Sequence, residues 1–229
     1  MTNNFNDDQV LSSWRAIAPT WSDVIENQEI ESRLLVTNQA IIDAIQSYKP
    51  KSVLDIGCGE GWLTRELTTL GISTSGVDGV SKLIDNAKAF GKNIPNNTYY
   101  ISSYEDIAKG NFIHPTVEAI VCNFSLIGKE AVDNLLYSLP SLLKPSGLLF
   151  IQTLHPLMAV GTFPYQNSWR PGSWDGFTRQ FTEAPPWYFR TIESWISLIC
   201  KSGFDLLEVR EPLHPHTQKP TSIIFIGQT

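Results

Sequence analysis

The chain has 229 residues, 42% of them hydrophobic and 17% charged, so it can bury the core of one α/β domain, and disorder is not expected. Its net charge of -6 argues against nucleic acid as the main partner, because phosphate backbones attract basic surfaces. Three widely spaced cysteines without a CxxC pair argue against a disulfide framework or a zinc site and favour a reducing cytoplasm.

The first 48 residues carry apolar side chains at helical intervals, and Lys49-Pro50-Lys51 ends this pattern. The first ten residues are polar and acidic and lack the apolar core of a signal peptide. No apolar run approaches the roughly 20 residues that a bilayer-spanning helix needs. We therefore expect a helical cap over residues 1–48, no membrane partner and a cytoplasmic protein.

Short apolar runs then alternate with amphipathic segments. The pattern predicts strands at 52–56, 72–78, 98–101, 119–122 and 148–152. Helices are predicted at 61–70, at 81–90 and around Ala131 to Leu142, where Pro140 should kink the helix or start a new turn. This order is typical of a parallel sheet with helices on both faces.

The C-terminal part differs from this alternation. A helix at 191–202 is followed by two strands at 204–211 and 222–227. The connection of about ten residues is too short for a parallel crossover, so these strands should form an antiparallel hairpin. The prediction is a single domain over residues 1–229, with a doubly wound, mostly parallel seven-stranded sheet that ends in this hairpin.

The first strand ends in the pattern Asp55-x-Gly57-x-Gly59-x-Gly61. Glycines permit a sharp turn and close approach of a ligand, and the next helix offers free N–H groups. A dinucleotide would place its pyrophosphate here, but the aspartate would repel it and would attract an ammonium group. S-adenosylmethionine carries such an ammonium and no phosphate.

The second strand ends at Asp78. A carboxylate at this position can accept hydrogen bonds from both ribose hydroxyls of an adenosine. It does not by itself distinguish nicotinamide from sulfonium cofactors, and it could instead cap the following helix. The ribose role is favoured.

Four segments in chain order resemble the motifs of class I S-adenosylmethionine-dependent methyltransferases: Val53 to Gly61, Gly76 to Asp78, Asn123 to Leu126 and Leu143 to Gly147. The resemblance covers roughly residues 30 to 229 and is greatest to members that act on small molecules. It implies a Rossmann-like methyltransferase fold, with S-adenosylmethionine as the cofactor and S-adenosylhomocysteine as the product.

The resemblance also implies the cofactor contacts, which we expect from the loop and from the ends of three further strands. The residues are Asp55, Gly57, Cys58, Gly59 and Gly61 around the methionine end, Asp78 and Gly79 at the ribose, Ser103 and Tyr104 at the adenine, and Asn123 and Phe124 near the sulfonium. Many members have an aspartate where Ser103 stands. Cys58 is interpreted as a small loop residue rather than a nucleophile.

Residues 156–190 form an insertion that is rich in aromatic side chains and too long for an ordinary loop. It leaves the edge of the sheet where α/β proteins bind ligands, so we expect a lid over the substrate. The expected pocket residues are Trp14, Trp21, Arg33, Tyr165, Trp169 and Trp174. The alternative is a satellite core under the loop, for which Trp187 to Phe189 are the best candidates.

His155 ends the fifth strand and could act as a general base for a hydroxyl acceptor, or equally be a turn histidine bonded to the backbone. Arg33, Arg170, Arg179 and Arg190 could receive an acidic substrate group, but solvated salt bridges are favoured for most of them. The histidines lack carboxylate or cysteine support at ligand spacing, so no metal site is expected.

The leading hypothesis is methyl transfer from S-adenosylmethionine to a small molecule, at oxygen rather than nitrogen. Asn123-Phe124-Ser125-Leu126 is not the Asn-Pro-Pro-aromatic motif of many amino-group methyltransferases. The alternatives are an NAD-dependent oxidoreductase and a non-catalytic S-adenosylmethionine-binding protein. The protein could be a monomer or a homodimer.

Overall fold

The computed structural model describes residues 5–95, 97–175, 177 and 179–229. The first four residues of the expected N-terminal cap therefore lie outside the described residues. Within the described chain, no helix is long and apolar enough to cross a membrane.

One sheet of seven strands forms the centre of the molecule, in the order β3-β2-β1-β4-β5-β9-β8. Strands β1 to β5 are parallel, and β9 pairs antiparallel with both β5 and β8, which confirms the predicted C-terminal hairpin. The strands are β1 (Ser52–Ile56), β2 (Ser73–Asp78), β3 (Thr98–Ile101), β4 (Val117–Asn123), β5 (Leu143–Leu154), β8 (Asp205–Arg210) and β9 (Ser222–Gln228).

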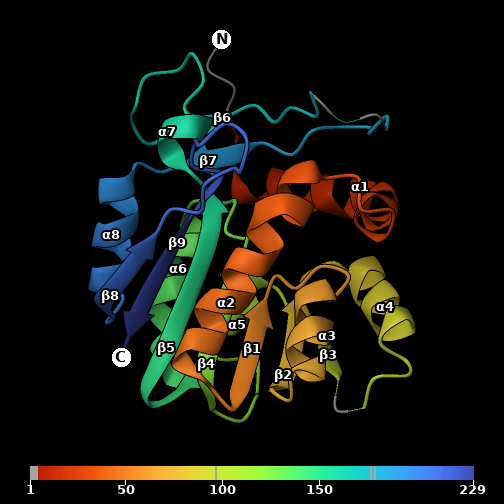
Figure 1. Cartoon of the computed structure of the whole chain (residues 1–229), viewed down its shortest axis with the longest axis vertical. Coiled ribbons are helices and arrows are strands. Elements are labelled where there is room, and N and C mark those ends of the chain that lie inside the picture. Colours follow the sequence, from red (N-terminus) through yellow and green to blue (C-terminus); the bar gives the residue numbers. More distant parts are fainter. Residues whose placement is uncertain (1–4, 96, 176, 178) are drawn as a thin grey trace.

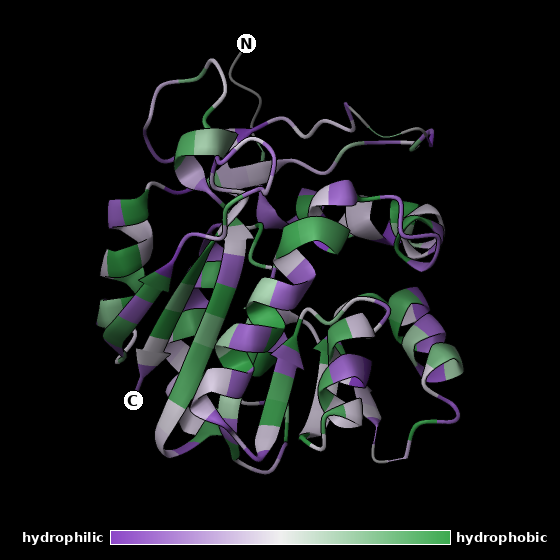
Figure 2. Ribbon diagram, in the orientation of Figure 1, coloured by the Kyte–Doolittle hydropathy of each residue, from purple (hydrophilic) through white to green (hydrophobic). Residues whose placement is uncertain are grey.

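Helices cover both faces of this sheet (Figure 1). On one face, Phe150 and Ile224 of the central strands pack with Ile45 of α2 and Leu67 of α3. On the other, Ile151 packs with residues of α6 and α8, and Figure 2 shows how strongly hydrophobic the central strands are. The helices are α2 (Asn38–Tyr48), α3 (Trp62–Thr69), α4 (Ser81–Phe90), α5 (Tyr104–Ala108), α6 (Glu130–Ser138) and α8 (Ile192–Lys201).

Most predicted boundaries agree with the structure to within one or two residues, but three elements were not predicted: the short helices α5 and α7 and a small hairpin in the insertion. Pro140 lies in the first turn of a 3-10 segment, Leu139–Leu142, which confirms the predicted new turn. The pairing of β4 with β5 contains a bulge before Leu148, because Val117 pairs with Leu143 whereas Ala119 pairs with Leu148.

Several segments gather at the carboxyl edge of the parallel strands (Figure 1). They are α1 (Asp7–Glu26), a π-helical turn (Arg33–Thr37), α7 (Pro156–Ala159), and the hairpin of β6 (Ser168–Arg170) and β7 (Trp187–Phe189). The Asp7 carboxylate accepts hydrogen bonds from the N–H groups of Lys129 (2.7 Å) and Ala131 (3.0 Å). This contact fixes the start of α1 to the start of α6, because a helix N-terminus offers unpaired donors.

Phe150 is fully buried in the middle of the sheet, and its ring lies 5.7 Å from that of Tyr48. Phe150→Ala should lower the free energy of unfolding by about 3–5 kcal/mol, since it leaves a cavity between β5 and α2. Ile113→Ala, at a 91% exposed position, is the matched control and should change it by less than about 0.5 kcal/mol. Urea unfolding measures both, and equal losses would contradict this assignment of the core.

Candidate functional site

The glycine-rich loop turns sharply between β1 and α3. Gly57, Gly59 and Gly61 have φ angles of +73°, +58° and +78°, a region that side chains rarely adopt. The N–H groups of Gly57 and Cys58 both donate to the carbonyl of Val77, at 2.8 and 3.1 Å. The chain thus makes the predicted sharp turn, and these bonds hold the loop against the end of β2.

Two of these glycines have opposite surroundings. A Cβ at Gly57 would lie 2.3 Å from the Cβ of Ser125 and 2.7 Å from the hydroxyl of Tyr104, so only glycine fits there. A Cβ at Gly59 would meet nothing within 4 Å. Gly59 therefore presents open backbone to a cavity, where a ligand can approach closely.

Asp78 joins the end of β2 to this loop. Its Oδ2 accepts the N–H of Gly59 at 3.0 Å, and its Oδ1 accepts the N–H of Val80 at 2.8 Å. The second bond leads into α4, so the capping alternative and a ligand role coexist. A carboxylate has about four lone-pair positions, and two remain for a ligand. Burial raises the pKa of Asp78 to about 6.

Asp55 lies behind the loop and not at the cavity wall. It is 1% exposed, and its Oδ2 accepts the hydroxyl of Thr64 at 3.0 Å. Burial raises its pKa to about 7. Gly61 is also away from the wall, against the ring of Tyr99. Both residues shape the loop from beneath.

A cavity of about 1190 Å³ extends over the carboxyl edge of the sheet. Typical small-molecule sites have about 300–1,000 Å³, so this one has room for two ligands side by side. We call its two ends the loop side and the aromatic side. The loop side is lined by Gly57, Cys58, Gly59, Asp78, Gly79, Ser103 and Tyr104, and the aromatic side by Ile127, Leu154, Pro156, Trp187, Tyr188, Phe189, Arg190, Trp195 and Thr221, with Asn123 and Phe124 between them.

Residues that follow β3 and β4 are held by their own hydrogen bonds. Ser103 caps α5 by accepting the N–H of Asp106 at 3.1 Å. The hydroxyl of Tyr104 donates to the carbonyl of Ser125 at 3.1 Å, and burial raises its pKa well above the usual value. The Oδ1 atom of Asn123 is buried and has no partner within the described part of the chain. Asn123 also lines the cavity, so this unpartnered oxygen lies close to its wall.

Three tryptophans from distant parts of the sequence form a roof over the cavity. The ring centroids of Trp14 and Trp21 in α1 are 5.2 Å apart, and Trp174 of the insertion lies 6.4 and 6.0 Å from them. All three line the cavity, as expected. The hydroxyl of Ser13 donates to Glu183 at 2.8 Å, which further ties α1 to the insertion.

Arg33 lines the cavity, but beside the glycine loop. Its guanidinium carbon lies 4.8 Å from the ring centroid of Trp62, and its Nε donates to Asn38 at 3.2 Å. Glu60 of the loop also lines the cavity, is 2% exposed, and has an Oε1 atom with no partner among the described residues. Burial lowers the pKa of Arg33 and raises that of Glu60, and the two charges oppose these shifts. The sequence analysis missed Glu60, although an acid between two glycines of the loop was a usable signal.

Three expected residues lie elsewhere. His155 is buried, does not line the cavity, and has its Nε2 atom 2.6 Å from Glu211 of the segment after β8. Tyr165 accepts the N–H of Ile192 at 3.0 Å, and Trp169 packs against Tyr188 at 5.5 Å, so both support the insertion from outside the cavity. Tyr165 and Trp169 therefore do not line the cavity, and the His155 ring contacts the Glu211 side chain rather than the backbone or the cavity, as neither of its two interpretations expected.

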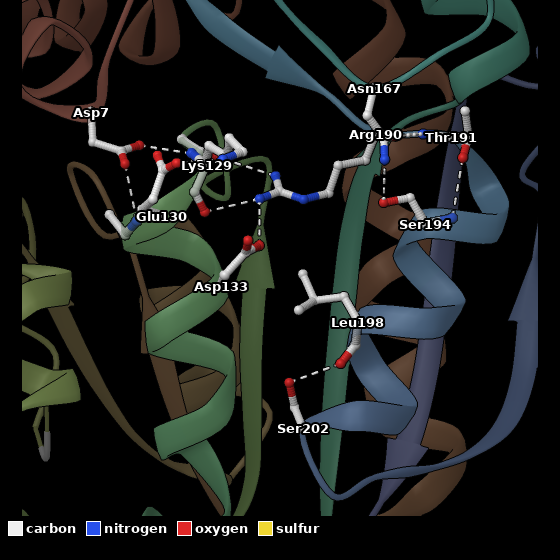
Figure 3. A network of polar contacts seen from close by, with 12 residues as sticks. Asp7, Lys129, Glu130, Asp133, Asn167, Arg190, Thr191, Ser194, Leu198 and Ser202 are labelled. Carbon is white, nitrogen blue, oxygen red and sulfur yellow. Dashed lines mark hydrogen bonds and ion pairs between the residues drawn. The ribbon is translucent and has the colours of Figure 1, made fainter.

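The expectation of solvated arginines holds only for Arg179, which pairs with Glu29 and Asp23. Arg170 and Arg190 are buried, at 1% and 3% exposure. Arg190 donates to the carbonyls of Gly128 (2.8 Å) and Lys129 (3.0 Å) and to Asp133 (2.7 Å), a network shown in Figure 3. Their burial could not be read from the sequence, because it depends on how the insertion folds back.

Comparison with known proteins gives a consistent result. A family profile described as "Methyltransferase domain" matches residues 34–209. The chain is 27% identical over 158 residues to a ubiquinone biosynthesis O-methyltransferase of Xanthomonas oryzae pv. oryzae, an alignment that covers 67% of this chain and 64% of the relative. It is 32% identical over 110 residues to a malonyl-[acyl-carrier protein] O-methyltransferase of Halalkalibacterium halodurans, over 47% of this chain and 41% of that protein.

The chain thus spans less than two thirds of the length of these two relatives. Its fold is also found in the 1,6-didemethyltoxoflavin-N1-methyltransferase of Burkholderia thailandensis, solved with S-adenosylhomocysteine bound. The TM-score is 0.64 at 12% identity, over 93% of this chain and 87% of that one.

The pKa of Asp78 leads to a test by pH. If the ionised carboxylate receives a ligand's hydroxyl groups, binding of S-adenosylhomocysteine should weaken below pH 6, approaching tenfold per pH unit, because protonation removes the acceptor. Calorimetry between pH 7.5 and 5 measures this. Asp78→Asn is the control: it should bind more weakly throughout, without that fall. An identical pH profile in the two proteins would contradict the assignment.

Proposed function

Because the chain belongs to the class I S-adenosylmethionine-dependent methyltransferases, we propose that it methylates an oxygen atom of a small molecule bound on the aromatic side of the cavity. S-adenosylmethionine is the methyl donor. The main observation that supports this proposal is that one cavity joins the glycine loop to an aromatic chamber. Donor and acceptor can therefore meet inside the protein, where in-line positioning supplies much of the catalysis.

The loop side has the groups that the donor needs. Gly59 offers open backbone, and Asp78 keeps free lone pairs for the ribose hydroxyls. Ser103 and Tyr104 line the place proposed for the adenine. The unpaired oxygen of Asn123 can accept from the ammonium of the methionine end. Each of these assignments is supported by a residue that lines the cavity and offers a group complementary to that part of the donor.

We further propose that Arg33 holds the carboxylate of that same methionine end. Its position beside Glu60 and Trp62 places a half-buried cation next to the loop rather than on the aromatic side. Glu60 then has two partners of opposite charge, Arg33 and the cofactor ammonium. An amino-acid group is a zwitterion, so a half-buried cation and a buried anion side by side are complementary to it.

The ionisable groups around the aromatic side favour oxygen over an aliphatic nitrogen as the acceptor atom. Asp7 is the cavity carboxylate nearest to the aromatic side, but both of its oxygens accept backbone N–H groups, and no imidazole lines that side in the described chain. Residues 1–4, 96, 176 and 178 carry no ionisable side chain. An aliphatic amine is protonated at neutral pH and must lose a proton before it can attack. The two relatives named above are both O-methyltransferases, which supports the same choice.

The roof of tryptophans fits a water-excluding role. Trp14 and Trp21 come from the N-terminal cap, Trp174 from the insertion, and their contacts close the cavity over the donor. Exclusion of water strengthens the electrostatic interactions inside and prevents side reactions. We therefore propose that residues 7–26 and the insertion act together as a lid.

Arg33→Met tests the placement of the methionine end. It should weaken binding of S-adenosylhomocysteine about 10- to 100-fold, as expected for a lost charged hydrogen bond, but leave binding of adenosine nearly unchanged. Adenosine lacks the amino-acid group, so calorimetry with both ligands isolates it. Arg15→Met, at an exposed position of the same cap, is the control. Equal losses for both ligands would place Arg33 elsewhere.

Methyl transfer itself is tested by incubating the protein with S-adenosylmethionine and a panel of phenols, alcohols, carboxylic acids and amines. S-adenosylhomocysteine should form only with an acceptor, and mass spectrometry should find the methyl group on oxygen. Asp78→Ala is the control and should reduce turnover at a fixed, low donor concentration. Products methylated only on nitrogen would contradict the choice of atom, and donor binding without any turnover would favour a non-catalytic protein.

A further inference from the structure

The aromatic side of the cavity is lined mainly by large aromatic side chains. Its walls are large and flat, with Trp187, Tyr188, Phe189 and Trp195 around the space. The rings of Trp187 and Phe189 meet edge to face, with centroids 5.9 Å apart. Such walls bury large apolar areas and fit a planar molecule. The shape therefore indicates an acceptor with an aromatic or extended conjugated body.

The charged side chain on this wall is Arg190, and it is cationic. It is 3% exposed and lies 4.9 Å from the ring of Tyr188 and 5.1 Å from that of Trp195. Arg190 pairs with Asp133 at 2.7 Å (Figure 3), and the Asp133 side chain is 37% exposed, so water screens the carboxylate more than the buried guanidinium. With the sulfonium cation of a bound cofactor added, Arg190 makes an anion a better occupant of this side than a cation.

The carboxylates that line the cavity belong to other parts of its wall. Asp78 and Glu60 lie on the loop side, Glu105 is on α5, and Asp8 is on the exposed side of α1. Asp7 lies nearer, but both of its oxygens accept backbone N–H groups. His155 contacts Glu211 and does not reach the cavity. In the described structure, the aromatic side thus has no group placed to remove a proton from a neutral hydroxyl.

One polar atom on the aromatic side of the cavity has no hydrogen-bond partner in the described chain. The Oγ1 of Thr221, at the start of β9, is buried and has no partner in the described chain, and Thr221 lines the cavity. A threonine hydroxyl can rotate to donate to an anionic oxygen. Leaving it unpaired would cost about 1–3 kcal/mol, so a ligand atom is the natural partner.

From these observations we propose that the acceptor is a planar aromatic carboxylate and the product its methyl ester. The inference rests on the proposed methyl transfer and specifies its substrate class. Arg190 and the sulfonium attract the anion, and Thr221 donates to the carboxylate oxygen that does not react. A carboxylate is already ionised at neutral pH, so it needs no base on this wall to remove a proton before it attacks the methyl group.

The reaction balances without any proton transfer. A lone pair of one carboxylate oxygen forms the new bond to the methyl carbon. The carbon–sulfur bond breaks, and its electron pair stays on sulfur, which becomes a neutral thioether. One negative and one positive charge disappear, so a dry aromatic chamber of low dielectric favours the transition state over the separated ions.

The test uses three probes with the same ring system: 2-naphthoic acid, 2-naphthalenemethanol and 2-naphthylamine. Formation of S-adenosylhomocysteine and of each methylated product is measured from pH 6.5 to 8.5. The acid should give a kcat/KM at least tenfold above those of the other two. Its rate should be constant with pH, because neither the acid nor a protein base changes its charge in this range.

A pair of variants tests the cation. Arg190→Gln should lower the ratio of kcat/KM for the acid to kcat/KM for the alcohol at least tenfold, whereas Arg190→Lys should retain part of this preference. Calorimetry with S-adenosylhomocysteine checks that each variant is folded and binds the cofactor. Should Arg190→Gln fail to fold, quenching of tryptophan fluorescence by 2-naphthoate in the unaltered protein gives the affinity directly, and binding no tighter than that of the alcohol would overturn the proposal.

The remaining outcomes are distinct. Preference for the alcohol would overturn this inference and leave oxygen methylation standing. Methylation of the amine alone would overturn both. Turnover of none of the three probes, with the cofactor bound and other oxygen acceptors active, would overturn the aromatic carboxylate and leave the proposed function intact.

Discussion

The hydrogen bond from the Gly59 N–H to Asp78 is the contact on which the site depends. It joins the loop after β1 to the end of β2, and the two N–H groups that reach the Val77 carbonyl strengthen the same junction. Gly57 must be glycine because Ser125, in the segment after β4, and Tyr104 of α5 leave no room for a Cβ. Four segments are therefore locked around one turn, and the loop can present its backbone to a ligand without the ligand having to order it.

This junction brings several acids together in a poorly solvated place. Asp55, Glu60 and Asp78 all have raised pKa values, chiefly because they are buried. The charge of Glu60 also raises the pKa values of Asp55 and Asp78, and the charge of Asp78 raises that of Asp55. Arg33 is the cation beside them, and its own burial lowers its pKa. Such a cluster is costly when empty and favourable when a cation enters. A cofactor with an ammonium and a sulfonium is thus suited to this end of the cavity, whereas a pyrophosphate would meet repulsion.

The sheet could be predicted from the sequence, because short β-branched runs between glycines leave few alternatives. The site was most predictable where position follows from the strand order: Gly57, Asp78, Ser103, Tyr104 and Asn123 come to one edge in any such fold. His155 also follows a strand, yet its ring turns toward Glu211, a residue 56 positions later. Tyr165, Trp169 and Arg170 lie in the insertion, where aromatic content indicates burial but not which rings face the ligand. α5 is too short, at five residues, to give a periodic signal.

Arg170 explains how an insertion with so little regular structure can still form a defined wall. Its guanidinium lies 3.5 Å from the ring centroid of Phe189 and donates to the carbonyls of Ala159, Val160 and Pro164. One side chain thus joins β7 to the irregular segment after α7, and the neighbouring Arg190 joins β7 to the start of α6. Because a planar cation can stack on rings and bond several carbonyls at once, two arginines suffice to fix both ends of the aromatic chamber. This arrangement supports the proposal that the insertion, held at these two points, determines which acceptor fits, while the loop side binds the donor.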